Sequence, residues 1–136
     1  MSDFKVIYKG NFSTEMIHLE SGEKIITDAP KDNQGLGRTF SPTDLVASSL
    51  GSCMVTIIAI AAKAHNLNIS SMASNVSKIM STTSPRRIDK IDVEIDIRCE
   101  FNEKEKKIIE RSARNCPVHH SLNPDIKINL NINYLK

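Results

Sequence analysis

The segment from Ile91 to Phe101 constrains the fold of this chain more than any other. Apolar and charged side chains alternate along it without interruption, with Ile91, Val93, Ile95, Ile97, Cys99 and Phe101 at the odd positions and Asp92, Glu94, Asp96, Arg98 and Glu100 at the even ones. Because successive side chains of a β-strand point to opposite faces, this period of two predicts a strand that is buried on one face only. A second alternating segment, residues 126–134, predicts a similar strand.

A long apolar segment, residues 45–62, predicts a helix that runs to about residue 64. Its start is marked by Ser41 as N-cap, Pro42 in the first turn and Asp44 where the helix dipole favours an acid. One expected apolar stripe consists of Val46, Leu50, Cys53, Ile57, Ile60, Ala61 and Ala64. Because other faces are apolar too, and the apolar run is shorter than the roughly 20 residues of a membrane span, we expect a buried central core helix.

Weaker signals fill in the remaining elements. Short apolar segments at residues 5–8, 16–19 and 24–27 are separated by turn residues and predict an antiparallel meander, followed by a long loop from Asp28 to Ser41. A weak strand is expected around residues 76–80, and Asn102 with Glu105 predicts a capping box for a helix that ends near residue 115. The order of elements predicts an α+β fold with antiparallel sheets packed around the long helix, and the length of 136 residues predicts one domain, 1–136.

Composition excludes several classes of partner. The 18 basic and 16 acidic residues give a net charge of only +2 and are evenly mixed, so we expect no nucleic-acid partner. The N-terminal residues lack the apolar stretch of a signal peptide, so we expect a cytoplasmic protein without a membrane partner. With three cysteines in a reducing compartment, any disulfide is expected to be transient and catalytic.

Two of the cysteines stand in contrasting settings. Cys53 lies inside the apolar helical segment, whereas Cys116 precedes Pro117 at a break. If tertiary folding brings them together, the chain has a two-thiol site, and if Pro117 opens a helical turn, the unpaired N–H groups there stabilise a thiolate on Cys116. The alternative is that Cys53 is a small core hydrophobe. Cys99 falls on the apolar face of the alternating strand, so we interpret it as core.

Two motifs carry a resemblance to a known family. The segments Phe40-Ser-Pro-Thr-Asp-Leu-Val-Ala-Ser-Ser-Leu-Gly-Ser-Cys-Met54 and Asn115-Cys-Pro-Val118 resemble the paired signature of the OsmC/Ohr family, the osmotically inducible and organic hydroperoxide resistance proteins. The element order is similar over essentially the whole chain. The resemblance implies an intertwined homodimer with two sites at the subunit interface. It also implies that Cys53 is the peroxidatic cysteine and Cys116 the resolving one.

The implied chemistry needs an activating group. Only a thiolate attacks a peroxide O–O bond, and an apolar setting disfavours the charged form, so the site must supply a cation or hydrogen bonds. Peroxidase members of the family use an arginine near the N-terminus and a glutamate just after the motif proline. Here Thr43 follows Pro42, and no arginine precedes Arg38. We therefore interpret Arg38 as the activating cation and Asp44 as its partner, a departure that resembles the OsmC-like branch of the family.

The expected function is cysteine-dependent reduction of organic hydroperoxides, with no bound cofactor and with an external dithiol as reductant, of the lipoyl or small-thiol kind that the family suggests. The alternative is a dimeric binding protein for a small lipophilic ligand, with inert or regulatory cysteines, which Thr43 favours. A hydrolase with Cys53 as nucleophile lacks a visible acid–histidine pair. His119 and His120 lack the spacing of zinc ligands, so no metal is expected.

Overall fold

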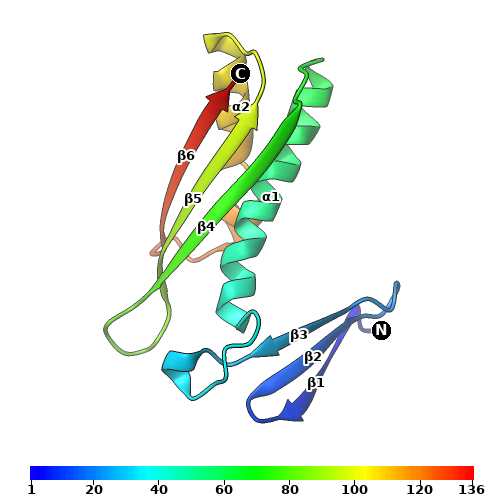
Figure 1. The fold of residues 1–136 in the computed structure, drawn as a ribbon, viewed down its shortest axis with the longest axis vertical. Coiled ribbons are helices and arrows are strands. Elements are labelled where there is room, and N and C mark those ends of the chain that lie inside the picture. Colours follow the sequence, from blue (N-terminus) through cyan, green and yellow to red (C-terminus); the bar gives the residue numbers. More distant parts are fainter. The chain divides into compact units, whose positions relative to one another are not determined.

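The computed structural model describes residues 1–136, which form two compact units, residues 1–46 and 47–136 (Figure 1). The first unit carries one three-stranded sheet, and the second carries another such sheet and most of the helical residues. The expectation of a single domain stays a prediction.

The first unit is built on an antiparallel meander, as predicted. Its strands β1 (Phe4–Gly10), β2 (Ser13–His18) and β3 (Lys24–Asp28) are hydrogen-bonded in the order β1-β2-β3. The β1–β2 turn places Asn11 and Phe12 at φ 54° and 59°. A two-residue type I′ turn requires positive φ at both residues. Hairpins favour this turn because its twist matches that of the flanking strands.

The segment from Asp28 to Ser41 is a loop, as predicted, except for one 3₁₀ turn, η1 (Lys31–Asn33). The loop folds back on β3, since the Asp28 N–H donates to the Phe40 carbonyl at 3.1 Å. Gly35 is required for this compact path, because a Cβ there would lie 1.6 Å from the Ala29 carbonyl oxygen.

The helix α1 (Pro42–Ala64) begins where the sequence predicts. The Asp44 N–H donates to Ser41 Oγ at 3.1 Å, and the Ser41 N–H donates back to Asp44 Oδ2 at 2.9 Å. This reciprocal pair satisfies two N–H groups that a helix start leaves without intrahelical partners. The helix ends before Asn66, which adopts the left-handed conformation at φ 55°.

The buried face of α1 differs from the predicted stripe. It consists of Ala47, Leu50, Gly51, Met54, Ile58 and Ala62. Of the predicted stripe only Leu50 belongs to it, while Val46 and Ile60 are exposed. The sequence of a helix that is apolar on most of its circumference does not single out one apolar face. Packing against the sheet therefore determines which face is buried. By length and composition α1 could cross a membrane, but its buried face packs in the core as that of a core helix does.

The sheet of the second unit contains β4 (Ser71–Met80), β5 (Ile88–Arg98) and β6 (Lys127–Leu135) in that order. The pair β4–β5 is antiparallel, but β6 runs parallel to β5. The expectation of purely antiparallel sheets is therefore wrong for this unit. The physical reason is the helical connection between β5 and β6, which returns the chain to the end of the sheet where β5 began, as a crossover between parallel strands does.

The alternating strand behaves as predicted. The side chains of Ile91, Ile95 and Ile97 are fully buried, whereas those of Glu94 and Arg98 are exposed. The strand starts at Ile88 and ends at Arg98, a few residues earlier than the pattern indicates at each end, so Cys99 and Phe101 follow the strand.

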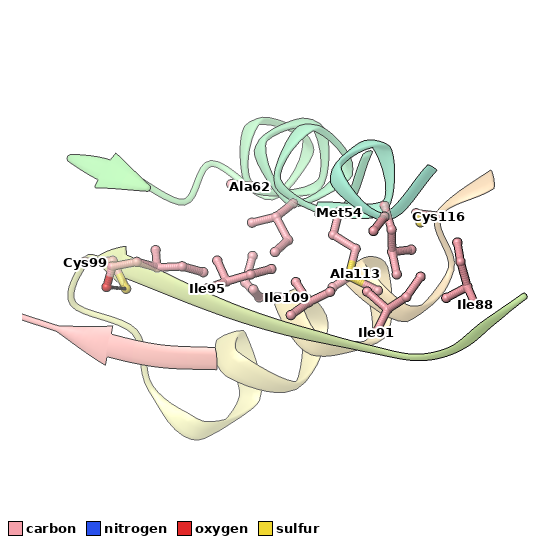
Figure 2. Packing of buried hydrophobic residues seen from close by; sticks show 14 residues of the cluster. Met54, Ala62, Ile88, Ile91, Ile95, Cys99, Ile109, Ala113 and Cys116 are labelled. Carbon is pink, nitrogen blue, oxygen red and sulfur yellow. Dashed lines mark hydrogen bonds between the residues drawn. The ribbon is translucent and has the colours of Figure 1, made fainter. Parts of the chain in front are cut away.

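Two helices complete the second unit. The helix α2 (Glu103–Arg114) has the predicted capping box, since Asn102 and Glu105 exchange hydrogen bonds between side chain and backbone. It is followed directly by the short α3 (Pro117–Ser121). Figure 2 shows side chains of α1, β5 and α2 meeting in one core that also includes Cys116.

Candidate functional site

Cys116 occupies the turn between α2 and α3. It is the N-cap residue of α3, Pro117 takes the first helical position, and Cys116 Sγ accepts a hydrogen bond from the His119 N–H at 3.2 Å. The predicted helical turn after Cys116 is therefore present. The side chain is also fully buried, with no accessible surface. The local sequence thus fixes the backbone of the turn, and the tertiary packing encloses the sulfur.

The thiol of Cys53 lies within hydrogen-bonding reach of Cys116. Cys53 projects from α1, is half-buried and packs against the hydrophobic core. Both cysteines are free thiols. The structure therefore brings together the two cysteines that the sequence analysis paired, although 62 intervening positions separate them in the chain.

Burial raises the pKa of the Cys116 thiol above the ordinary value of 9.0. The His119 N–H acts in the opposite direction, because its hydrogen bond favours the thiolate. The neighbouring Cys53 raises the pKa further, both by accepting a hydrogen bond from the Cys116 thiol and by the repulsion between two thiolates. The raised pKa therefore keeps the Cys116 thiol protonated beside Cys53.

Two histidines of α3 form hydrogen bonds with residues at the end of α2. His119 Nδ1 lies 2.9 Å from the Arg114 carbonyl oxygen, and His120 Nε2 lies 2.8 Å from Asn115 Oδ1. Their rings stack at a centroid distance of 5.8 Å. From the sequence these residues were interpreted as a polar surface, with one histidine modulating Cys116, and this supporting role was missed. No group of three or more His, Cys, Asp or Glu side chains is arranged to hold a metal ion.

Arg38 is held by Asp28 within the first unit. Arg38 Nε donates to Asp28 Oδ2 at 2.8 Å, Nη2 donates to Oδ1 at 3.0 Å, and the backbone N–H donates to Oδ2 at 2.9 Å. The Asp28 side chain is 1% exposed, and the hydrogen bond from the Arg38 side chain is the main cause that lowers its pKa to about 2. Sequence reasoning missed Asp28, for which the only signal was an acid at the start of a long loop that also contains an arginine.

Asp44 caps the start of α1 through Ser41, as described above. Asp44 and Arg38 belong to the first unit, whereas Cys53 and Cys116 belong to the second. The interpretation of Arg38 and Asp44 as groups that activate a thiol stays a prediction.

Comparison with known proteins assigns the family. The family model described as OsmC-like protein matches residues 34–131. The chain belongs to the OsmC-like family. No curated protein matches it. Among solved structures it is similar to an osmotic stress induced and detoxification response protein from Psychrobacter arcticus 273-4, with 45% identity, coverage of 97% of this chain and 96% of that one, and a TM-score of 0.91.

More distant structures share the fold of this OsmC-like protein. An OsmC like protein from Mycoplasma pneumoniae is 23% identical, with coverage of 100% and 98% of the two chains and a TM-score of 0.84. The organic hydroperoxide resistance protein OsmC from Legionella pneumophila is 14% identical, with coverage of 96% and 94% and a TM-score of 0.78. The α+β fold expected from the resemblance is therefore confirmed.

The third cysteine of this OsmC-like protein lies in the core. Cys99 is 7% exposed, and its thiol is directed to the Ile97 carbonyl at 3.9 Å. Burial raises its pKa. Cys99 is influenced by burial, Lys106 and Glu105 and not by another cysteine, so the thiol chemistry of the site rests on Cys53 and Cys116. Two neighbouring thiols can be oxidised to a disulfide when their Cα separation allows the bond.

Proposed function

We propose that this protein reduces organic hydroperoxides to alcohols with its cysteine thiols. The observation that carries the proposal is that Cys53 and Cys116 are neighbours at an apolar core. A similar fold in the Legionella pneumophila organic hydroperoxide resistance protein supports the substrate class, although the identity to that protein is only 14%.

The proposed reaction has two steps. The Cys53 thiolate attacks the terminal oxygen of the hydroperoxide, the O–O bond breaks, and the alkoxide takes up a proton to leave as the alcohol. Cys53 is then a sulfenic acid. The Cys116 sulfur attacks the Cys53 sulfur, a disulfide forms, and the sulfenic hydroxyl leaves as water with the proton of Cys116.

The assignment of the two roles follows from burial. Cys116 is fully buried and its pKa is raised, so it holds its proton until it is needed for the second step. Cys53 is the more exposed of the two, which makes its sulfur the one that a substrate can reach. An external dithiol of the lipoyl or small-thiol kind then exchanges with the disulfide and restores both thiols.

We also propose that Arg38 and Asp44 help to ionise Cys53, and that the chain acts as a homodimer. Three hydrogen bonds to Asp28 fix the position of Arg38, and none of them uses Nη1 of the guanidinium. The dimer is supported by large apolar side chains at the surface, among them Phe4 and Tyr8 of β1, which are 63% and 64% exposed.

A second function, binding of a small lipophilic ligand by a dimer with inert cysteines, is favoured by one observation. Arg38 is already engaged by Asp28, and Thr43 stands where an acid is expected from the family, so the activating pair of the peroxidases is not reproduced at the matching positions. The oxidation experiment separates the two functions.

In that experiment, the fully reduced protein is treated with one equivalent of cumene hydroperoxide, and its thiols are followed by mass spectrometry. We expect a disulfide between the Cys53 and Cys116 peptides within minutes. Cys53→Ser should abolish peroxide consumption, and Cys116→Ser should leave a sulfenic acid on Cys53 that dimedone traps. Cys99→Ser is the matched control and should behave as the wild type.

Absence of thiol loss over minutes would contradict the peroxidase proposal and favour the binding function. So would peroxide consumption by Cys53→Ser at the wild-type rate, because the reaction would then not depend on that sulfur.

A further inference from the structure

Gly51 stands in the middle of α1, two residues before Cys53, and it is buried. Glycine is unfavourable in a helix interior, because it loses more backbone freedom on folding than alanine does. A buried helical glycine is therefore expected to have a packing reason.

That reason is the close approach of α1 to β4. A Cβ at Gly51 would lie 2.6 Å from Val76 Cγ2 and 3.0 Å from Ser74 Oγ, both on β4. The first distance is far shorter than the roughly 3.5–4.0 Å of a favourable carbon–carbon contact. Val76 is β-branched and stiff at χ1, so its methyl group cannot turn away freely. A side chain at position 51 therefore requires a shift at this contact, and a displacement of α1 from the strand is one that relieves it.

The two sulfurs of the site are held by different elements. Cys53 moves with α1, whereas Cys116 is held in the α2–α3 turn by the His119 N–H and by its burial in the core. A displacement of α1 from β4 thus moves one sulfur and leaves the other in place. Disulfide geometry has little tolerance, with an S–S bond of about 2.0 Å and a narrow range of Cα separations, so a small displacement strains the bond.

We propose that Gly51 is a positioning residue for the Cys53–Cys116 pair: its missing side chain sets how closely α1 packs on β4 and thereby the separation of the two sulfurs. The inference rests on the proposed function for its biological meaning. The effect on disulfide formation, however, can be measured without any peroxide.

The test is equilibrium oxidation in a glutathione buffer. Two protein thiols and one oxidised glutathione give the protein disulfide and two reduced glutathione molecules, so electrons balance within the pair. The fraction of the Cys53–Cys116 disulfide is measured by mass spectrometry after acid quenching. For Gly51→Ala we expect the equilibrium constant for disulfide formation to fall about tenfold or more, because strain makes a disulfide easier to reduce.

Rescue and control variants separate positioning from general destabilisation. Val76→Ala removes the nearest obstructing methyl, so Gly51→Ala combined with Val76→Ala should recover most of the wild-type equilibrium constant. Val76→Ala alone and Ser52→Ala, at an exposed neighbouring position of α1, should change it little. If Gly51→Ala does not fold, Ser74→Thr presses on the same contact from the strand side and should shift the equilibrium in the same direction.

An unchanged equilibrium constant in Gly51→Ala would overturn the inference, and so would a reduced one that Val76→Ala fails to restore. Both results leave the proposed function standing if the wild type consumes hydroperoxide. Conversely, a wild type that forms the disulfide with glutathione but ignores hydroperoxide refutes the peroxidase and leaves the role of Gly51 intact.

Discussion

Arg38 and Asp28 form a two-pronged ion pair, in which Nε donates to Oδ2 at 2.8 Å and Nη2 donates to Oδ1 at 3.0 Å. A third hydrogen bond, from the Arg38 N–H to Oδ2, attaches the backbone of the loop to the same carboxylate. The pair closes the loop onto the end of β3, so the residue proposed to activate a thiol also organises the first unit. Bidentate arginine–carboxylate pairs combine strength with a fixed geometry.

Acid should weaken the first unit through Asp28. The pKa of Asp28 is lowered from 3.8 to about 2 in the folded state. The stabilisation is therefore fully present above the unfolded value of 3.8 and is lost as the pH falls through about 2. Urea unfolding of the wild type and of Asp28→Asn should differ at about pH 6 and converge near pH 2. Glu20→Gln, an exposed change in the same unit, should show no such convergence.

Removal of Cys53 should change the ionisation of Cys116. Burial is the largest cause of the raised Cys116 pKa, and the hydrogen bond and charge of Cys53 add to it. In Cys53→Ala the Cys116 pKa should therefore fall. Residue-specific alkylation followed by mass spectrometry across alkaline pH measures the change. An unaltered alkylation profile would mean that the two thiols do not interact in solution.

Replacement of Ser74 by alanine should stabilise the protein. Its Oγ is buried without a hydrogen-bond partner. An unsatisfied buried hydroxyl costs roughly 1–3 kcal/mol, so Ser74→Ala should raise the free energy of unfolding by about 1 kcal/mol. Urea denaturation provides the measurement, and Ser77→Ala, exposed on the same strand, is the matched control. A destabilised Ser74→Ala would show that the hydroxyl has a partner.

The capping box of α2 should contribute measurably to stability. Asn102 Oδ1 accepts a hydrogen bond from the Glu105 N–H at 2.9 Å. Loss of an N-cap side chain typically costs about 1 kcal/mol, so Asn102→Ala should lower the free energy of unfolding by that amount. Lys104→Ala, exposed within the same first turn, should have a much smaller effect in the same denaturation assay.

Self-association should depend on the exposed apolar face of β1. Phe4, Val6 and Tyr8 are between 62% and 64% exposed, and successive even positions of a strand share one face. Sedimentation velocity should give a dimer for the wild type, and Val6→Lys should shift it toward monomer. Lys5→Gln, on the opposite face of β1, should remain dimeric. A monomeric wild type at all accessible concentrations would refute the dimer.

Local patterns identified the elements wherever one physical cause dominated. The alternation around Val93 predicted a one-sided strand, the Asn102–Glu105 pair predicted a helix start, and both are present. The start of α1 at Pro42 was predicted for the same reason, since capping depends on side chains within a few residues. The buried face of α1 was predicted incorrectly, because a helix that is apolar on most sides has no single apolar face in its own sequence.

The sequence by itself determined the type and order of the elements, the cap at Cys116 and, through the family motifs, the choice of Cys53 and Cys116 as the residues to examine. Only the tertiary structure decided that β6 lies parallel to β5, that Gly51 meets β4, and that Cys53 and Cys116 are neighbours. The reason is that periodicity and capping are short-range properties of the chain. Strand pairing, helix contact and thiol contact depend on packing between segments far apart in the sequence.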